Sequence, residues 1–152
     1  MTVKVPPNGT RGVPFPRFLA GFANRLVLRR FHRGGLHTQG GLPTLLLESR
    51  GAKSGQSRHA ALGYLEERPG SWLVIASMGG AARHPAWLYN LAQQPEATIE
   101  FDGGSRVAVR AESLERAQLD EAWTRIAVDA PEYVTYRSKT DRVIPVLRLL
   151  RR

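Results

Sequence analysis

The sequence predicts one α+β domain, in which a mostly antiparallel sheet of about six strands closes into a small barrel with helices packed outside it. Six short apolar or alternating segments have the length and composition of strands. Short connections that contain glycine or proline join several of them, as in the hairpins of antiparallel sheets. With 152 residues, of which 42% are hydrophobic, the chain is long enough to bury one core.

The charge balance favours anionic partners. The chain has 22 Lys and Arg against 13 Asp and Glu, a net charge of +9, and a pI near 11.0. The absence of cysteine excludes disulfides and cysteine-based metal sites, and we expect no metal. Neither a signal peptide nor an apolar run long enough to cross a bilayer is visible, so we expect a cytoplasmic protein.

The first 35 residues contain no Asp or Glu, and the first acidic residue of the chain is Glu48. Residues 1–14 are rich in proline and glycine and are expected to form a flexible arm. Residues 15–35 are expected to form a basic amphipathic helix, and residues 36–152 the barrel domain. The helix can contact an anionic membrane surface through residues 15–33, or pack on the domain with its arginines in water. Its apolar stripe comprises Phe15, Phe18, Leu19, Phe22, Leu26 and Val27.

Residues 48–59 form a basic connection between two predicted strands. Arg50, Lys53 and Arg58 place three cations there, beside serine hydroxyls such as that of Ser54 and two glycines that permit close approach. This combination suits an anion, such as a phosphate group. The alternative is a solvated basic turn, and the spacing of a Walker loop is absent.

A second informative stretch leads from a buried strand over 72–76, through Gly79–Gly80, into a helix that begins near Pro85. The N-terminus of a helix offers free N–H groups and a partial positive charge, so this stretch is a second candidate anion site. The alternative is a plain strand-to-helix turn, with Trp87 in the core and His84 as a capping residue.

The rest of the chain supplies the remaining elements. Residues 97–101 and 106–110 form a predicted hairpin, and residues 113–128 have helical periodicity. A shorter helix over 131–137 places two tyrosines on one face. The predicted strands are 42–47, 60–66, 72–76, 97–101, 106–110 and 143–150.

Four motifs follow one another along the chain: Arg50-Gly51-x-Lys53-Ser54-Gly55-x-x-Arg58, Ala76-Ser77-x-Gly79-Gly80-x-x-x-x-Pro85-x-Trp87-x-x-Asn90-Leu91, Pro131-x-Tyr133-x-x-Tyr136 and Thr140-Asp141-Arg142-x-Ile144-Pro145. Together they resemble the deazaflavin-dependent nitroreductase family, from Leu42 to Pro145. The resemblance implies a split β-barrel, related to flavin-binding pyridoxamine-oxidase-like proteins. It also implies coenzyme F-420, an anionic deazaflavin with a phosphodiester and a polyglutamate tail. Family members transfer hydride to nitro compounds, quinones or activated double bonds.

The resemblance also implies roles for individual residues. The basic connection should meet the phosphate and the tail, and the 76–79 stretch should line the tricyclic ring with backbone N–H groups. Tyr133 and Tyr136 should lie on the substrate side, where one can bond or protonate the developing anion. The implied cofactor-binding residues are Arg50, Lys53, Ser54, Arg58, Ala76, Ser77, Met78, Gly79, Pro85, Trp87 and Asn90.

Two positions depart from the family pattern. Met78 stands where members often have a lysine that contacts phosphate. Ala130 stands where the best-known nitroreductases have a tyrosine, which argues against nitroimidazole reduction and leaves quinone or enone reduction open.

The expected function is therefore F-420-dependent hydride transfer to a small-molecule acceptor. The same barrel with FMN is an alternative, and so is a non-enzymatic relative that binds cofactor, lipid or nucleic acid. Nucleic acid is not expected as a partner, because the aromatic residues lie in apolar runs and do not alternate with the cations. A monomer and a homodimer both stay open.

Overall fold

The computed structural model describes the backbone of residues 2–14, 20–35 and 38–152, and all of their side chains except those of residues 20–24. The described strands are β1 (Thr38–Gln39), β2 (Leu42–Arg50), β3 (Ser57–Arg68), β4 (Ser71–Ile75), β5 (Glu96–Phe101), β6 (Arg106–Ser113) and β7 (Val146–Arg151). The described helices are α1 (Ala20–His32), the 3-10 helix η2 (Met78–Gly80), α2 (Ala86–Gln93), α3 (Arg116–Asp129) and α4 (Pro131–Ser138).

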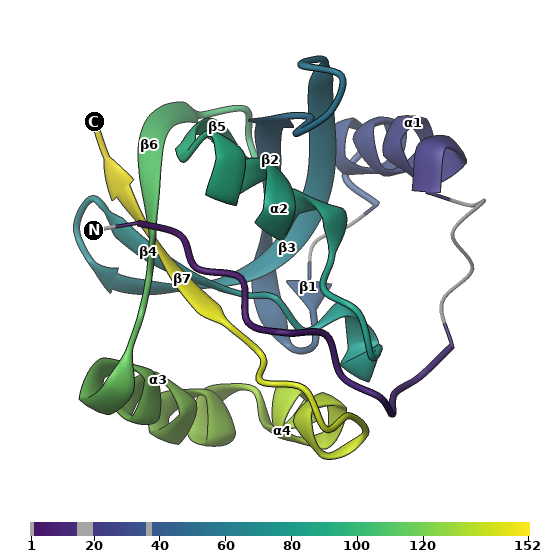
Figure 1. The fold of residues 1–152 in the computed structure, drawn as a ribbon. Helices are drawn as coiled ribbons and strands as arrows, with labels where there is room; N and C mark the ends of the chain where they lie inside the picture. Colours follow the sequence, from purple (N-terminus) through teal and green to yellow (C-terminus); the bar gives the residue numbers. More distant parts are fainter. Residues whose placement is uncertain (1, 15–19, 36–37) are drawn as a thin grey trace.

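Six strands close into a barrel in the order β2-β3-β4-β7-β6-β5, and β5 returns to pair with β2 (Figure 1). Every pairing in this ring is antiparallel. Strand β2 closes the barrel because it pairs with both ends of the strand series. Its Leu45, for example, pairs with Leu62 of β3 on one side and with Phe101 of β5 on the other. The predicted α+β class with an antiparallel barrel is confirmed.

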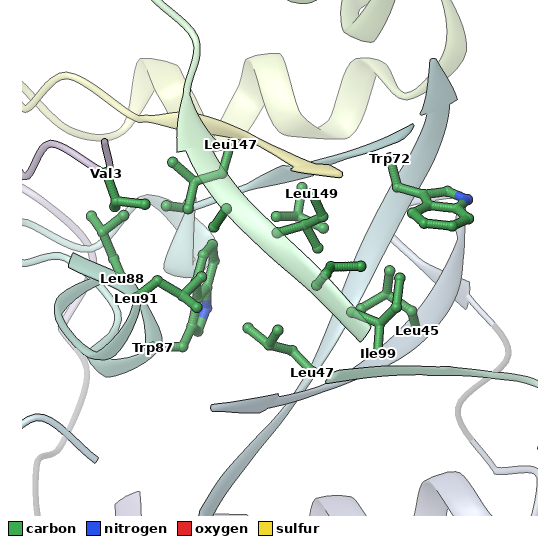
Figure 2. Packing of buried hydrophobic residues seen from close by; sticks show 14 of the residues in the cluster. Val3, Leu45, Leu47, Trp72, Trp87, Leu88, Leu91, Ile99, Leu147 and Leu149 are labelled. Carbon is green, nitrogen blue, oxygen red and sulfur yellow. The ribbon is translucent and has the colours of Figure 1, made fainter. Parts of the chain in front are cut away.

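The barrel interior is filled by the inward side chains of alternating strand positions. On β6, for example, Val107, Val109 and Ala111 are buried, while the residues between them are exposed or half-buried. Figure 2 shows side chains of α2 on one side of this cluster and Trp72 at its opposite end. Helix α2 thus fills one end of the barrel, and this packing fixes its position relative to the strands.

A second apolar cluster lies between the barrel and the pair α3 and α4. Trp123 and Ile126 of α3 and Tyr133 of α4 pack with strand residues such as Ile75 and Val146. Figure 1 shows these two helices on the side of the barrel away from α1, which contacts β3. No helix within the described ranges is both long and apolar enough to cross a membrane.

Several strand and helix ends differ from the sequence expectation, and β2, β3 and β6 extend beyond their predicted ends to Arg50, Arg68 and Ser113. The last strand begins at Val146 rather than at Val143, because Pro145 has no N–H to donate to a ladder. Helix α3 begins at Arg116 rather than at Ser113, because Ser113 still pairs with Leu147 at the end of β6. The short strand β1 was not predicted, since its two residues give no detectable periodicity.

The segment 2–14, which the sequence predicts as a flexible arm, lies against the domain in the structure. It crosses the face of the domain that carries α2 and η2 (Figure 1). Backbone N–H groups of Gly9 and Val13 donate to the carbonyls of Ala82 (2.7 Å) and Gly80 (3.0 Å). We call residues 2–14 the N-terminal strap. A run rich in proline and glycine can follow a surface closely, and flexibility does not follow from composition alone.

Candidate functional site

The connection between β2 and β3 spans residues 51–56, shorter than the predicted 48–59, because β2 runs to Arg50 and β3 begins at Ser57. Together with the flanking strand residues Arg50 and Arg58, we call this compact connection the basic loop. The N–H of Gly51 donates to the carbonyl of Gln56 (2.8 Å), and the N–H of Gly55 donates to that of Gly51 (2.8 Å). Gly55 has φ of +69°, a left-handed conformation that favours glycine. A surface cavity of about 530 Å³ is lined by Arg50, residues 51–55, Gln93 and Gln94.

The cations of this loop face solvent. Lys53 and Arg58 are exposed, and neither forms an ion pair with a residue that the structure describes. Arg50 donates one hydrogen bond, from Nη1 to the carbonyl of Gly55 (3.3 Å). The backbone of the loop is thus held by its own hydrogen bonds while its charges face solvent, and anion binding there stays a prediction.

Asn90 of α2 holds this loop in place. Its Oδ1 accepts a hydrogen bond from the Ala52 N–H (2.9 Å), and its Nδ2 donates to Ser49 Oγ (3.5 Å). Asn90 is buried, so its amide is used to fix the loop on the helix. The sequence singled out this residue as a direct cofactor contact, whereas its contacts in the structure support an indirect role.

The second stretch forms a left-handed turn. Ser77 is in the right-handed helical region (φ −78°), and Met78, Gly79 and Gly80 follow with φ of +45°, +64° and +88°. A right-handed residue followed by a left-handed one turns successive N–H groups toward one point, which makes a cradle for a negatively charged or carbonyl oxygen. Within the described residues, the N–H groups of Met78 and Gly79 have no acceptor.

The backbone of this turn also shows strain. Met78 is one of two non-glycine residues with positive φ in the described chain. Such conformations cost about 1–3 kcal/mol and persist where the surroundings enforce them. Gly80 must lack a side chain, because an added Cβ would lie 2.6 Å from the carbonyl oxygen of Tyr136 in α4. The turn is therefore wedged against α4.

Helix α2 separates the turn from the basic loop. The turn precedes its N-terminus, and the loop contacts its C-terminal half through Asn90, Gln93 and Gln94. Eight residues of helix span about 12 Å at 1.5 Å per residue. The two candidate anion-binding segments thus lie at opposite ends of α2, as an elongated ligand with two polar parts would need.

The α2 residues that the sequence proposed as contacts are built into the fold. Pro85 is the buried N-cap of α2, and Trp87 packs in the barrel core with 8% of its surface exposed. Ala76 and Ser77 are buried as well, and the backbone of Ala76 is committed to the fold, since its N–H donates to the carbonyl of Pro145 (2.9 Å) and its carbonyl accepts from Arg142.

Arg142 holds the turn from behind, and this role was missed from the sequence. Its guanidinium donates to the carbonyls of Ala81 (2.7 Å from Nε), Ala76 (3.0 Å from Nη1) and Ser77 (2.7 Å from Nη2). Nη1 also lies 3.2 Å from Nδ1 of His84. Arg142 lies in the last of the four motifs, but its type alone does not reveal that it binds backbone carbonyls.

His84 joins the turn to the N-terminal strap. Because Arg142 can only donate, Nδ1 of His84 accepts, and Nε2 carries the proton that binds the carbonyl of Pro6 (2.8 Å). The N–H of His84 also donates to Oδ1 of Asn8 (3.1 Å). Burial, followed by the Arg142 charge, lowers the pKa of His84 below its usual value.

The two candidate catalytic tyrosines have different surroundings. Tyr133 is buried, and its hydroxyl donates to the carbonyl of Gln39 (3.1 Å). Its burial raises the pKa of its phenol. Tyr136 is half-buried and donates to Oε1 of Glu132 (2.7 Å), a bond that raises its pKa. The rings meet edge to face, 5.4 Å apart.

Comparison with known proteins gives the family. The family described as F-420H(2)-dependent quinone reductase matches residues 24–151. This chain belongs to that family. A quinone reductase of this kind from Mycobacterium tuberculosis is 37% identical over 123 residues, which cover 79% of this chain and 81% of the relative.

Two solved structures are also similar to this chain. One is an F-420-H2-dependent reductase, with 33% identity and a TM-score of 0.62, over 70% of this chain and 93% of the other. The second is described as a domain-swapped dimer, with 30% identity and a TM-score of 0.64, over 89% of this chain and 99% of the other.

As a member of the quinone reductase family, the chain is a deazaflavin-dependent reductase with coenzyme F-420 as its cofactor. The family therefore favours F-420 over the FMN alternative. The residues present fit this coenzyme, because unpaired cations suit its phosphodiester and free N–H groups suit the polar edge of its ring.

Proposed function

We propose that F-420 lies along α2, with its phosphodiester on the basic loop and the polar edge of its ring on the left-handed turn 77–80. The observation that carries this assignment is the pair of free N–H groups at Met78 and Gly79, at the other end of α2 from Lys53 and Arg58. When bound in its reduced form, the coenzyme supplies a hydride, which carries two electrons to the quinone.

The residues around the turn must then place the acceptor and stabilise the oxygen that gains negative charge. We propose Tyr136 for this role, because α4 packs against the turn at Gly80 and Tyr136 is only half-buried. Its phenol stays protonated because its pKa is raised, and at this half-exposed position the hydroxyl would turn from Oε1 of Glu132 to donate to the acceptor. Tyr133 supports α4 instead, because its hydroxyl is buried on Gln39.

Fluorescence titration tests the position of the cofactor. Lys53→Ala and Arg58→Ala should each weaken F-420 binding by about 1–3 kcal/mol, the usual cost of losing a charge-assisted bond. FMN should bind weakly to the wild type. Wild-type affinity in both variants would show that the basic loop does not bind the coenzyme.

Single-turnover oxidation of reduced F-420 by menadione tests the tyrosines. Tyr136→Phe should lower the rate by about 10²-fold or less and leave F-420 affinity unchanged. Tyr133→Phe, which also removes one hydroxyl from α4, is the matched control and should react at the wild-type rate. Equal rates in the wild type and both variants would contradict a role for either hydroxyl in the reaction. The pocket would then contribute only by placing the acceptor next to the coenzyme.

We also propose that α1 contacts an anionic membrane surface. Arg25, Arg29 and Arg30 are exposed on it, and Leu26 is 54% exposed beside them. The opposite side is docked, because Phe31 is buried. The predicted contribution of residues 15–19 and of the Phe22 side chain lies outside the described part of the chain.

Vesicle sedimentation tests this contact. Each cation near an anionic surface adds about 1 kcal/mol, so replacing Arg25, Arg29 and Arg30 by glutamine should release the protein from anionic vesicles. Neutral vesicles are the control, and equal partition into both would contradict the contact.

The similar structure described as a domain-swapped dimer favours a homodimer over a monomer for this chain. Light scattering of the purified protein measures the oligomeric state.

A further inference from the structure

We propose that Arg142 is a positioning residue for hydride transfer, which holds the left-handed turn 77–80 in the shape that receives the deazaflavin ring and links that turn to the N-terminal strap. This inference rests on the function proposed above, because it takes the turn as the ring site. Arg142 itself lies behind the turn and touches neither coenzyme nor acceptor in this arrangement.

The first argument is the way in which Arg142 is satisfied. Its side chain is buried, with 5% of the residue exposed, yet it forms no ion pair with any described residue. The neighbouring carboxylate of Asp141 binds the N–H groups of Thr10 and Arg11 instead. A buried charge without a counterion is costly, so a residue that only fills space here would be better replaced by an apolar one.

The second argument is the geometry of the carbonyls. Ala76 and Ser77 lie where the chain enters the turn, and Ala81 lies where it leaves. Because the carbonyls of all three accept from Arg142, one rigid guanidinium holds both ends of the turn together. A planar fork with several donors imposes this geometry, whereas the ammonium of lysine would not. The positive φ at Met78 is the kind of conformation that needs such support.

The third argument is the connection to the strap. Through His84 the guanidinium is joined to the carbonyl of Pro6, and the strap in turn bonds to the carbonyls of Gly80 and Ala82. The strap therefore covers the segment from Gly80 to His84, while Arg142 fixes the same segment from the interior. Loss of Arg142 should loosen both layers together.

The decisive variant is Arg142→Lys, which keeps the charge and loses the fork. Three measurements are made on the whole protein: F-420 affinity by fluorescence, single-turnover oxidation of fully bound reduced F-420 by menadione, and amide hydrogen exchange without cofactor. The matched control is Arg148→Lys, since Arg148 is also buried (8% exposed) but binds Glu67 and Glu112 away from the turn.

We expect Arg142→Lys to lower both F-420 affinity and the single-turnover rate by about tenfold to a hundredfold, because small displacements of a reacting ring have such effects. Exchange should accelerate at residues 78–82 and in the strap. Arg148→Lys should lower the unfolding midpoint and leave affinity and rate within about twofold of wild type.

A folded Arg142→Lys protein with wild-type affinity, rate and exchange would overturn the inference. If Lys53→Ala and Arg58→Ala weaken binding in the same series, the proposed site stands and only the role of Arg142 is wrong. If Arg142→Lys and Arg148→Lys lose affinity and rate equally, Arg142 has only a general structural role, and the inference is likewise overturned.

Discussion

Arg142 and Arg148 are two buried arginines, six positions apart, that the fold uses in opposite ways. Arg148 of β7 binds Glu67 through Nε and Nη2 (2.7 Å each) and Glu112 through Nη1 (2.9 Å), and these carboxylates raise its pKa. Arg142 meets only carbonyls and a neutral imidazole, and burial lowers its pKa. The charge of Arg148 is compensated within the barrel wall, whereas that of Arg142 remains beside the turn that we assign to the coenzyme.

The difference shows how the same residue type serves stability in one place and geometry in another. Around Arg148 the partners are side chains of two other strands, Glu112 of the adjacent β6 and Glu67 of β3, which lies beyond β4, so the cluster ties β3, β6 and β7 together. Around Arg142 three partners are backbone atoms of one segment, so the side chain dictates the path of that segment.

The largest effect on unfolding is expected from Arg148→Met. It leaves the mostly buried Glu112 without its cation and Glu67 with only the exposed Arg68, which should lower the free energy of unfolding by about 3 kcal/mol, the low end of the range for breaking a buried pair. Urea unfolding measures the loss. The folded fraction should keep its F-420 affinity, and a loss below about 1 kcal/mol would contradict the contrast between the two arginines.

A smaller effect is expected from Gly12→Ala in the strap. An added Cβ would lie 2.6 Å from the carbonyl carbon of Ala81 and also meet the backbone of Ala82, so the strap must move away from the turn. Overpacking of this kind costs about 1–3 kcal/mol. Limited proteolysis should cleave residues 2–14 faster, whereas Val13→Ala, at an exposed neighbouring position, should be cleaved as the wild type is.

Acid pH should loosen the Arg142 region before the Arg148 region. The imidazole of His84 faces Arg142, the ring of Tyr89 and the carbonyl of Pro6, and no carboxylate among described residues pairs with it. Its pKa in the folded protein is lowered from 6.5, so the unfolded chain binds the proton more readily. The stabilisation is complete above about pH 6.5 and is lost as the pH falls through the lowered pKa.

Hydrogen exchange of the strap at pH 7.5 and at pH 5.5, corrected for intrinsic rates, measures this effect. Protection of residues 6–13 should fall at the lower pH, while protection of β7 around Arg148 stays constant. His84→Gln, which cannot be protonated, is the control and should show the same protection at both values. Equal loss of protection in wild type and control would assign the effect to other groups.

Much of the fold could be predicted from the sequence, because strand alternation and glycine-containing hairpins are local signals. Alternation in residues 106–110, for example, marks the inward side chains Val107 and Val109. Closure of the barrel by pairing of β2 with β5 joins residues about 50 positions apart, and local periodicity does not encode such a partner. The strap was missed for the same reason, since its partners are backbone groups near residue 80.

The candidate site could be predicted in part. Exposed cations such as Lys53 and Arg58 are visible from residue type and spacing, and the structure places Lys53 in the loop beside the cavity and Arg58 on the adjoining strand β3. Roles that depend on burial were not visible: Asn90 fixes the loop, and the hydroxyl of Tyr133 is committed to Gln39. The type of an Asn or Tyr residue does not reveal whether its side chain bonds to a ligand or to another part of the protein.

The smallest effect concerns the two carboxylates that compensate Arg148. Both oxygens of Glu67 accept from this guanidinium, so Glu67→Gln must turn an NH2 group toward one of its N–H donors. Glu112 uses only Oε1, so Glu112→Gln can keep its bond through the amide oxygen and lose the charge alone. We expect losses in unfolding free energy of about 1–3 kcal/mol at Glu67 and less than about 1 kcal/mol at Glu112, measured by urea unfolding. Neither change should alter F-420 affinity, because both carboxylates bind Arg148 and not the turn. Equal losses at the two positions would mean that net charge, rather than the two-pronged contact, holds Arg148 in the barrel wall.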